Sequence, residues 1–294
     1  MCRHIAYLGP PATLHELIIE PPHGLYRQAW APRRQRYGTV NADGFGVGWY
    51  ADGDPLPARY RRDRPIWADP SFADVARVTR TTALVAAVRC ATVGTEAGEA
   101  AAAPYATGPW LFSHNGALDG WPDVAAALAA TLPAGELLTL QARSDSALLW
   151  AIVLHRLRAG AGLDIALAAA MTLLDTERVA GRFNFLLTDG SAIAATAAGD
   201  TLCYRRSDDH VVVASEPCDD EPGWTWVPDR SVLTVTVGGT RISPLAPPGT
   251  TSTGTTPTGT TPTGRTADGK DPDRKDPDRK DLTGRTASGR TASG

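Results

Sequence analysis

The residue with the clearest chemical potential in this chain is Cys2, which directly follows Met1. Cysteine is small enough to permit removal of the initiator methionine, and the thiol and a free α-amine would then lie on one residue. The usual pKa is about 7.7–8.0 for an α-amine and about 8.5 for a cysteine thiol, so near neutral pH the amine can serve as a base for the thiol. The alternative interpretation is a second residue without a catalytic role.

Three polar positions farther along the chain fall where predicted elements begin or end. Arg89 ends a predicted apolar strand, Asn115 and Gly116 follow another, and Asp145 comes directly after Ser144, a predicted helix N-cap. Each position also has a purely structural explanation. A strand-end arginine can be an ion-pair partner, Asn-Gly is a common turn, and an acidic residue stabilises the first turn of a helix.

The elements that must position these residues follow from hydrophobic patterning. Strands are expected first, over residues 3–8, 43–50, 58–62, 83–89 and 110–114. Helices are expected over residues 14–19, 72–79, 123–131, 144–157 and 164–176. The last part is nearly all β, over residues 183–188, 192–196, 202–205, 211–214 and 232–237, with hairpin turns at 189–190, 199–200 and 238–239. This order predicts an α+β fold with two stacked sheets inside and helices outside.

Composition divides the 294-residue chain into two parts. Residues 1–248 form a body large enough for one sizeable core. Residues 249–294 consist almost entirely of small, polar and charged residues in short repeats, which predicts a disordered low-complexity tail. The tail holds eight Lys and Arg against six Asp, and the body keeps 21 basic and 26 acidic residues.

Several classes of function are disfavoured by the sequence. The mildly acidic body lacks the clustered basic charge expected of a nucleic-acid-binding protein, and no apolar run is long enough for a membrane span or a secretory signal. The four cysteines and six histidines show no metal-ligand spacing, so neither a metal nor another cofactor is expected. Reduced thiols predict a cytoplasmic protein.

The glycine-rich stretch 44–48 is not followed by a phosphate-loop signature. Its alternating glycines predict a strand that another backbone or a ligand approaches closely.

The order of the motifs resembles the class II glutamine amidotransferases, a family of N-terminal nucleophile hydrolases. The resemblance rests on Cys2, then residues 88–92 (VRCAT), residues 113–116 (SHNG) and residues 144–146 (SDS). It covers roughly residues 2–245 and implies a four-layer αββα sandwich of two antiparallel sheets. Residues 31–50, which include NADGFGVGWY, are similar to the branch that hydrolyses γ-glutamyl-hercynylcysteine S-oxide in ergothioneine biosynthesis.

The resemblance also implies a role for each polar position. Cys2 would attack the γ-glutamyl amide to form a thioester, with its own α-amine as base. Asn115 and Gly116 would form the oxyanion hole. Arg89 would bind the α-carboxylate of the glutamyl group, and Asp145 its α-ammonium. His4, one strand period from Cys2, is an alternative base.

The leaving half of such a substrate is a trimethylated histidine betaine joined to a cysteine sulfoxide. Aromatic rings attract quaternary ammonium groups, and arginine binds carboxylates. Arg33, Arg34 and Arg36 lie among the aromatic residues of segment 24–50 and are therefore candidates for binding the betaine. The alternative is a surface loop packed over the sandwich.

Other functions stay open at this level. The chain could be a glutaminase that supplies ammonia to a separate synthase, or a γ-glutamyl peptidase acting on glutathione-like compounds. It could also be an inactive sandwich that serves as an interaction module, although such a protein would not need the whole set of polar residues.

Overall fold

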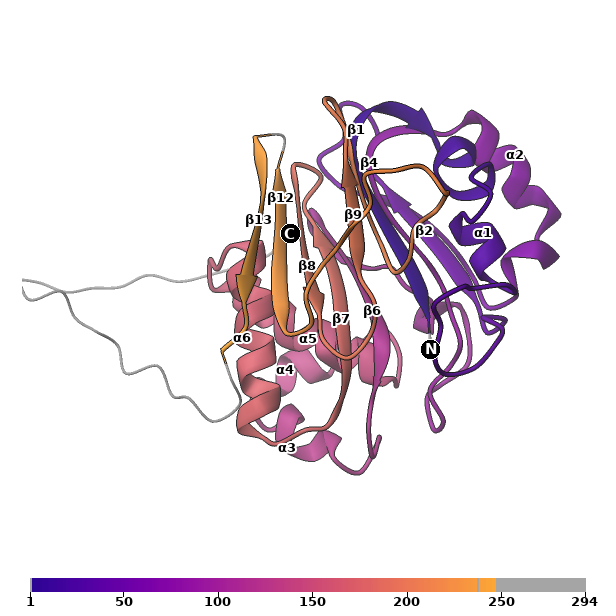
Figure 1. Ribbon diagram of the computed structural model, residues 1–294. Coiled ribbons are helices and arrows are strands. Elements are labelled where there is room, and N and C mark those ends of the chain that lie inside the picture. The colour runs from indigo at the N-terminus through magenta and orange to yellow at the C-terminus, as the bar shows by residue number, and fades with distance from the viewer. Residues whose placement is uncertain (1, 237, 247–294) are drawn as a thin grey trace, which may run out of the picture. The chain divides into compact units, whose positions relative to one another are not determined.

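Two antiparallel sheets lie at the centre of the computed structural model, which describes residues 2–236 and 238–246 (Figure 1). The predicted tail, residues 249–294, lies outside the described residues. The first sheet contains, in spatial order, β11 (Thr225–Trp226), β9 (Cys203–Arg206), β10 (Val211–Ala214), β1 (Arg3–Thr13), β4 (Arg80–Val88), β2 (Phe45–Trp49) and β3 (Ala58–Arg62). The second contains β13 (Gly239–Pro244), β12 (Ser231–Thr236), β8 (Ala192–Ala197), β7 (Gly181–Thr188), β6 (Trp110–Leu118) and β5 (Tyr105–Thr107).

Helices cover the outer face of each sheet (Figure 1). The first sheet packs against η1 (His15–Ile19), α1 (Leu25–Gln28) and α2 (Pro70–Val78). The second packs against α3 (Ala125–Ala129), α4 (Ala134–Leu137), α5 (Asp145–Arg158) and α6 (Leu163–Thr176). Two short 3-10 turns, η2 (Ile66–Ala68) and η3 (Glu99–Ala101), lie in connecting segments. The four-layer αββα sandwich is therefore confirmed.

Three hydrophobic clusters hold the four layers together. One lies between the first sheet and helices η1, α1 and α2. Another lies between the second sheet and helices α5 and α6. The third lies between the two sheets and takes side chains from both, among them Ala6, Val85, Leu186 and Leu233, which are all fully buried. Alternation along β1 explains this division, because Ile5 and Tyr7 face the helices while Ala6 and Leu8 face the other sheet.

Two helices begin at side-chain caps: the predicted N-cap Ser144 is confirmed, whereas α2 begins at Pro70, before the predicted start at residue 72, at a cap that was not predicted. The Ser144 hydroxyl accepts a hydrogen bond from Ala147 N at 3.2 Å and begins α5. The Asp69 carboxylate accepts one from Ser71 N at 3.2 Å and begins α2, with Pro70 in the first turn. Both contacts satisfy backbone donors that a helix start leaves without partners.

Several predicted boundaries are wrong for identifiable reasons. The sequence Gly9-Pro10-Pro11 does not end β1, because a register shift between Leu8 and Ala12 lets pairing with β4 resume at Ala12. The helix predicted at residues 14–19 is present as the π-helix His15–Ile19, whereas the predicted loop at residues 24–43 contains the short helix α1. The turn at residues 199–200 is not a hairpin, since it carries the chain from β8 in the second sheet to β9 in the first.

The alternating glycines of β2 have the predicted close neighbours. A Cβ at Gly46 would collide with the Ala103 carbonyl, and one at Gly48 would collide with the Leu111 side chain. The space is therefore occupied by the protein's own atoms. The hairpins at residues 189–190 and 238–239 are also confirmed, whereas Val237, the last residue of the predicted strand 232–237, lies outside the described residues.

Replacing Leu186 by alanine should lower the free energy of unfolding by about 2–5 kcal/mol, because it opens a cavity between the sheets. Urea unfolding followed by circular dichroism measures this loss. Leu138→Ala is the matched control, since Leu138 is 88% exposed and its truncation should cost less than about 0.5 kcal/mol. Equal losses in both variants would contradict the assigned packing between the sheets.

Candidate active site

Cys2 lies at the start of β1, between the ends of β4 and β10. Its Sγ is 3.9 Å from the Cys90 carbonyl oxygen, just beyond β4. Burial raises the pKa of the Cys2 thiol, while the hydrogen bond to Cys90 and the positive charge of Arg89 act in the opposite direction. At neutral pH the thiol is therefore protonated and needs a base before it can attack an amide.

Ser215 joins the start of β1 to the second sheet. Its backbone N–H donates to the His4 carbonyl, and its hydroxyl accepts from His4 N at 3.0 Å. The same hydroxyl oxygen accepts from Asn115 Nδ2 at 3.3 Å. One serine therefore fixes Asn115 of β6 against the strand that carries Cys2.

Asn115 and Gly116 lie inside β6 and do not form the turn that Asn-Gly often makes. Asn115 pairs with Asn184 and Gly116 with Phe183 on β7. The Phe183 N–H donates to the Ala198 carbonyl, toward β8, so the Gly116 N–H must point toward the opposite edge of β6. On that edge β5 pairs only with residues 110–112 of β6, so the Gly116 N–H makes no hydrogen bond to β5. A Cβ at Gly116 would also collide with the Arg182 carbonyl, so the close pairing of β6 with β7 requires glycine here.

The Arg89 guanidinium is nearly buried and binds neutral oxygens. It donates to the Asp43 and Glu96 carbonyls at 3.3 and 3.0 Å and to the Thr95 hydroxyl at 3.1 Å. In the described part of the chain it makes no ion pair with a carboxylate. The purely structural explanation of Arg89, as an ion-pair partner within the protein, therefore finds no support in the described residues.

Asp145 begins α5 and ties the helix to two other segments. Its Oδ2 accepts from the Leu118 backbone N–H at 3.1 Å and from the Thr92 hydroxyl at 3.3 Å. Its Oδ1 accepts from the N–H and hydroxyl of Ser146 at 2.8 and 3.3 Å. The carboxylate is 98% buried and has no cationic partner among the residues that the structure describes.

Tyr105 shows that three of the predicted residues belong to one electrostatic environment. Burial raises the pKa of Tyr105 to about 12, and the charges of Arg89, Asp145 and Cys2 also act on it. Its hydroxyl lies 3.1 Å from the Ser144 hydroxyl at the helix N-cap. The fold thus brings together Cys2, Arg89 and Asp145 from three distant parts of the sequence.

Glu216 connects Cys2 to the arginine-rich loop. Its buried carboxylate accepts from the backbone N–H groups of Arg33 and Arg34 at 2.8 and 2.7 Å and lies 3.7 Å from Arg3 Nη1. Arg3 in turn donates to the Cys2 carbonyl at 2.8 Å. The loop that carries Arg33, Arg34 and Arg36 is therefore fixed beside the start of β1, on the side opposite Arg89.

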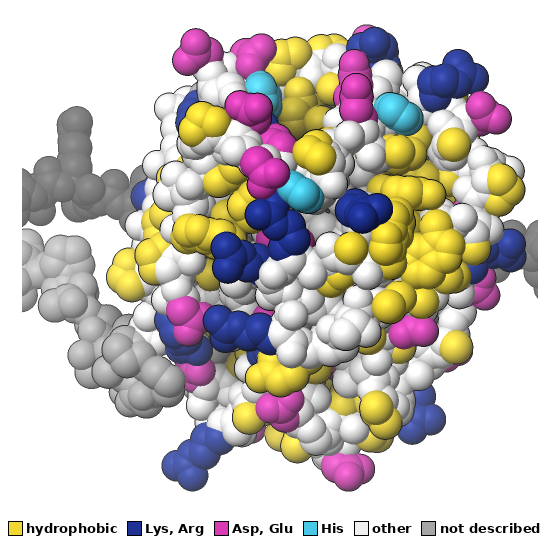
Figure 2. All heavy atoms as spheres, turned by 45° about the vertical axis from the view of Figure 1, so that its right-hand side comes forward, with side chains coloured by type: hydrophobic (Ala, Val, Ile, Leu, Met, Phe, Trp, Pro, Cys, Tyr) yellow, Lys and Arg dark blue, Asp and Glu magenta, His cyan; other side chains and the backbone are white. Residues whose placement is uncertain are grey.

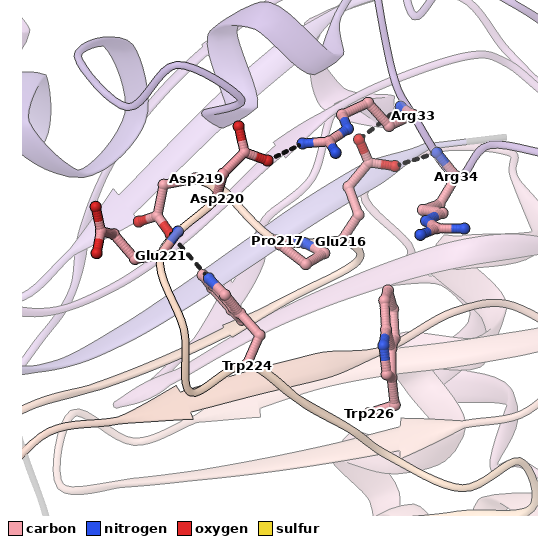
Figure 3. Close-up of a pocket in the computed structure, with 9 residues that line it drawn as sticks. All are labelled: Arg33, Arg34, Glu216, Pro217, Asp219, Asp220, Glu221, Trp224 and Trp226. Atoms are coloured by element: carbon pink, nitrogen blue, oxygen red, sulfur yellow. Dashed lines mark hydrogen bonds and ion pairs between the residues drawn. The ribbon is translucent and has the colours of Figure 1, made fainter.

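The arginine side chains of this loop differ in their surroundings. The Arg33 guanidinium forms an ion pair with Asp220 at 2.7 Å, and the Arg34 guanidinium lies 5.7 Å from the centre of the Trp226 ring (Figure 3). Arg36 lines a cavity together with Asp200. Most of the aromatic residues in segment 24–50 do not join them, because Tyr26, Trp30, Trp49 and Tyr50 pack against the cores.

His4 points between the two sheets. Its Nδ1 is 3.2 Å from the Ser113 hydroxyl, and burial holds its pKa well below the usual value. In the described residues no hydrogen bond joins it to Cys2. The structure therefore gives no support to His4 as the base.

Several residues of this region were not predicted from the sequence, namely Arg3, Tyr105, Asn184, Asp200, Ser215, Glu216 and Trp226. Ser215 and Glu216 could have been found, since they follow a buried strand immediately, as Arg89 does. Within residues 2–236 and 238–246, no cluster of His, Cys, Asp and Glu could hold a metal ion, and no helix is long and apolar enough to cross a bilayer.

The fold and this arrangement of residues agree with comparisons to known proteins. The sequence profile of the class-II glutamine amidotransferases matches residues 25–221. The chain belongs to this family.

Two relatives and one solved structure give further detail. The γ-glutamyl-hercynylcysteine sulfoxide hydrolase of Mycolicibacterium smegmatis is 42% identical over 247 residues, which cover 83% of this chain and all of the relative. The protein of the same name from Mycobacterium tuberculosis H37Rv is 41% identical over 245 residues, which cover 83% of this chain and 97% of the relative. A glutamine aminotransferase class-II domain protein from Silicibacter pomeroyi is 25% identical, with a TM-score of 0.61 over 84% of this chain and 100% of that one.

The buried histidines should make the fold sensitive to acid. Burial lowers the pKa of His4 and His114 in the folded state, so below about pH 6.5 the unfolded chain binds more protons and stability falls as pH falls. Each such histidine contributes at most about 1.4 kcal/mol per pH unit. We expect His4→Gln to reduce the slope of unfolding free energy between pH 6.5 and 5, measured by urea unfolding. His15→Gln, at a side chain that is 43% exposed, is the matched control for removal of a histidine. An unchanged slope in the His4 variant would contradict this assignment.

Proposed function

We propose that this chain hydrolyses the γ-glutamyl amide of γ-glutamyl-hercynylcysteine sulfoxide and releases glutamate and hercynylcysteine sulfoxide. The observation that carries the proposal is the match to relatives of that name along their full length, combined with the gathering of Cys2, Arg89 and Asp145. The partner is a small molecule, and the reaction takes place in the cytoplasm without a cofactor. Residues 1–248 form the catalytic domain, and residues 249–294 are a separate tail.

Arg89 and Asp145 bind the amino-acid end of the glutamyl group. That end carries a carboxylate and an ammonium on one carbon, and the two residues offer one charge of each sign. The absence of an ion pair for either side chain in the described residues supports this role, because each lacks a partner of opposite charge. The two hydroxyl contacts to Asp145, both 3.3 Å long, are the ones that an ammonium would replace.

The oxyanion hole consists of Asn115 and Gly116. The Gly116 N–H points away from β7. The Leu118 N–H points to the same edge of β6 and donates a hydrogen bond to the Asp145 carboxylate. Asn115 Oδ1 is buried and has no hydrogen-bond partner among the described residues. Rotation of this amide by 180° lets Oδ1 accept from the Ser215 hydroxyl and turns Nδ2 to the unpartnered position, where it can donate to an oxyanion.

Cys2 is the nucleophile, and its α-amine is the base once Met1 is removed. The amine takes the thiol proton as sulfur attacks the γ-carbonyl carbon, and the resulting ammonium gives a proton to the leaving nitrogen when the amide bond breaks. Water then attacks the Cys2 thioester, with the same amine as base, and glutamate leaves. The raised pKa of the Cys2 thiol supports the need for this base.

Arg33, Arg34 and Arg36 contact the leaving group. Glu216 holds their loop beside Cys2, which supports a role in substrate binding. The face in Figure 2 mixes basic side chains with acidic and hydrophobic ones, which suits a zwitterionic small molecule better than a nucleic acid.

Purified protein incubated separately with γ-glutamyl-hercynylcysteine sulfoxide, glutamine and γ-glutamylcysteine tests the proposal. We expect glutamate release to be fastest from the sulfoxide, because the residues beside Cys2 bind its leaving half. Intact mass should show loss of Met1, and Cys2→Ala should be inactive. Fast turnover of glutamine alone would point to a glutaminase, and fast turnover of γ-glutamylcysteine alone to a peptidase. No turnover of any substrate by processed enzyme would point to an interaction module.

Asn115→Ala should lower kcat on the sulfoxide by about 10²–10³, with little change in KM, because the oxyanion exists only in the transition state. Initial-rate kinetics measure both constants. Thermal unfolding of the same preparation shows whether the fold is intact. A folded variant whose kcat stays within threefold of wild type would remove Asn115 from the oxyanion hole.

A further inference from the structure

Two cavities lie on the β10 side of β1, opposite Arg89. The first, of about 260 Å³, is lined by Arg33, Arg34, Glu216, Trp224 and Trp226 together with a run of acidic residues (Figure 3). The second, of about 360 Å³, is lined by Arg36, Asp200, Thr201 and Trp226, among others. Trp226 therefore forms a wall of both cavities.

The strand order of the first sheet decides which part of a substrate can reach these cavities. β1, which carries Cys2, lies between β4 on one side and β10, β9 and β11 on the other. Arg89 follows β4, whereas Glu216 follows β10, Asp200 precedes β9, and Trp226 lies on β11. If the glutamyl group is bound at Arg89, as the proposed function requires, the leaving group must extend across β1 toward Trp226.

Trp226 is available for a ligand. It lies in a two-residue edge strand, pairs with Cys203 through its backbone, and keeps 44% of its side chain exposed. The neighbouring Trp224 is engaged by the protein itself, because its Nε1 donates to Asp219 at 2.9 Å and Arg205 lies 5.0 Å from its ring centre. Trp226 makes one similar contact, with the Arg34 guanidinium 5.7 Å from its ring centre, but in the described residues its indole makes no hydrogen bond.

Two arginines beside Trp226 make no ion pair with a carboxylate in the described residues, although the positive charge of Arg36 acts on the Asp200 carboxylate in the second cavity. Arg33 is paired with Asp220, but in the described residues the guanidinium groups of Arg34 and Arg36 make neither an ion pair nor a hydrogen bond. Arg34 already lies over the Trp226 ring at 5.7 Å, which shows that a cation fits against the indole. A carboxylate bound by Arg34 or Arg36 would therefore lie next to this ring.

We propose that Trp226, Arg34 and Arg36 form the subsite for the betaine half of the leaving group. A betaine carries a quaternary ammonium and a carboxylate on one carbon, and the subsite offers an aromatic face next to guanidinium groups. The trimethylammonium lies against the indole, and the carboxylate lies on an arginine. Trp226 thereby selects the fully methylated substrate over its unmethylated counterpart, whose primary ammonium is more strongly hydrated.

Steady-state kinetics on two substrates test this subsite. One is γ-glutamyl-hercynylcysteine sulfoxide, and the other is the same compound with an unmethylated α-amine. Wild type should prefer the methylated compound by about tenfold in kcat/KM. Trp226→Leu should reduce this preference to near one, mainly through a higher KM, and Trp226→Phe should keep most of it. Trp67→Leu is the matched control, because Trp67 is 40% exposed, packs on Trp30 and lines neither cavity.

Each outcome separates this inference from the proposed function. Loss of the methyl preference in Trp226→Leu, with wild-type values in Trp67→Leu, supports the subsite. An equal loss on both substrates, or no loss on either, overturns the subsite while leaving the hydrolase function in place. If wild type releases glutamate from glutamine but not from either sulfoxide, the proposed function fails, and the inference fails with it.

Discussion

The buried carboxylate of Glu216 is the interaction on which the arrangement around Cys2 depends. A buried carboxylate is costly unless its oxygens receive hydrogen bonds, and this one receives them from the backbone of the arginine-rich loop and lies close to Arg3. Arg3 then holds the Cys2 carbonyl. Through one side chain, a loop from residues 31–36, the start of β1 and the end of β10 are fixed to one another.

Ser215, the residue before Glu216, extends this connection to the second sheet. Its hydroxyl receives the His4 N–H from one sheet and the Asn115 amide from the other. The distance between Cys2 and Asn115 is therefore set by the packing of the two sheets as well as by local contacts. Two consecutive residues at the end of β10 thus contact both sides of the site. Glu216 binds the loop, and Ser215 binds the second sheet.

Much of this was predictable, because strand periodicity and helix caps are local signals. The four layers, the N-cap at Ser144 and the gathering of Arg89 and Asp145 follow from residues that are close in sequence or from the order of the motifs. The contacts of Glu216 were not predictable, since they join segments more than 180 residues apart. The crossing at residues 199–200 was missed because a Gly-Asp pair is compatible with a hairpin and with a change of sheet alike. Asn115-Gly116 was placed beyond its strand for the same reason.

The aromatic residues illustrate a different limit. Segment 24–50 holds several aromatic side chains, and composition alone cannot say which of them pack inward. Five of them, including Phe45, join the cores, and the sixth, Tyr37, packs against the Arg182 guanidinium, while Trp226, almost two hundred residues away, lines both cavities. A cavity lined by two segments that are distant in sequence leaves no pattern in either segment.

The way in which Glu216 holds the loop has a consequence for how the family can diverge. It binds backbone N–H groups at positions 33 and 34, and every residue except proline has such a group. These two contacts therefore do not depend on which side chains, other than proline, the loop carries at positions 33 and 34. Exchanges at positions 33, 34 and 36 can therefore alter the lining of the two cavities while the contacts of Glu216 to the loop backbone and to Arg3 remain. The start of β1 and the lining of the cavities thus belong to separate parts of one scaffold, and natural variation or laboratory evolution can alter the second while the first is preserved.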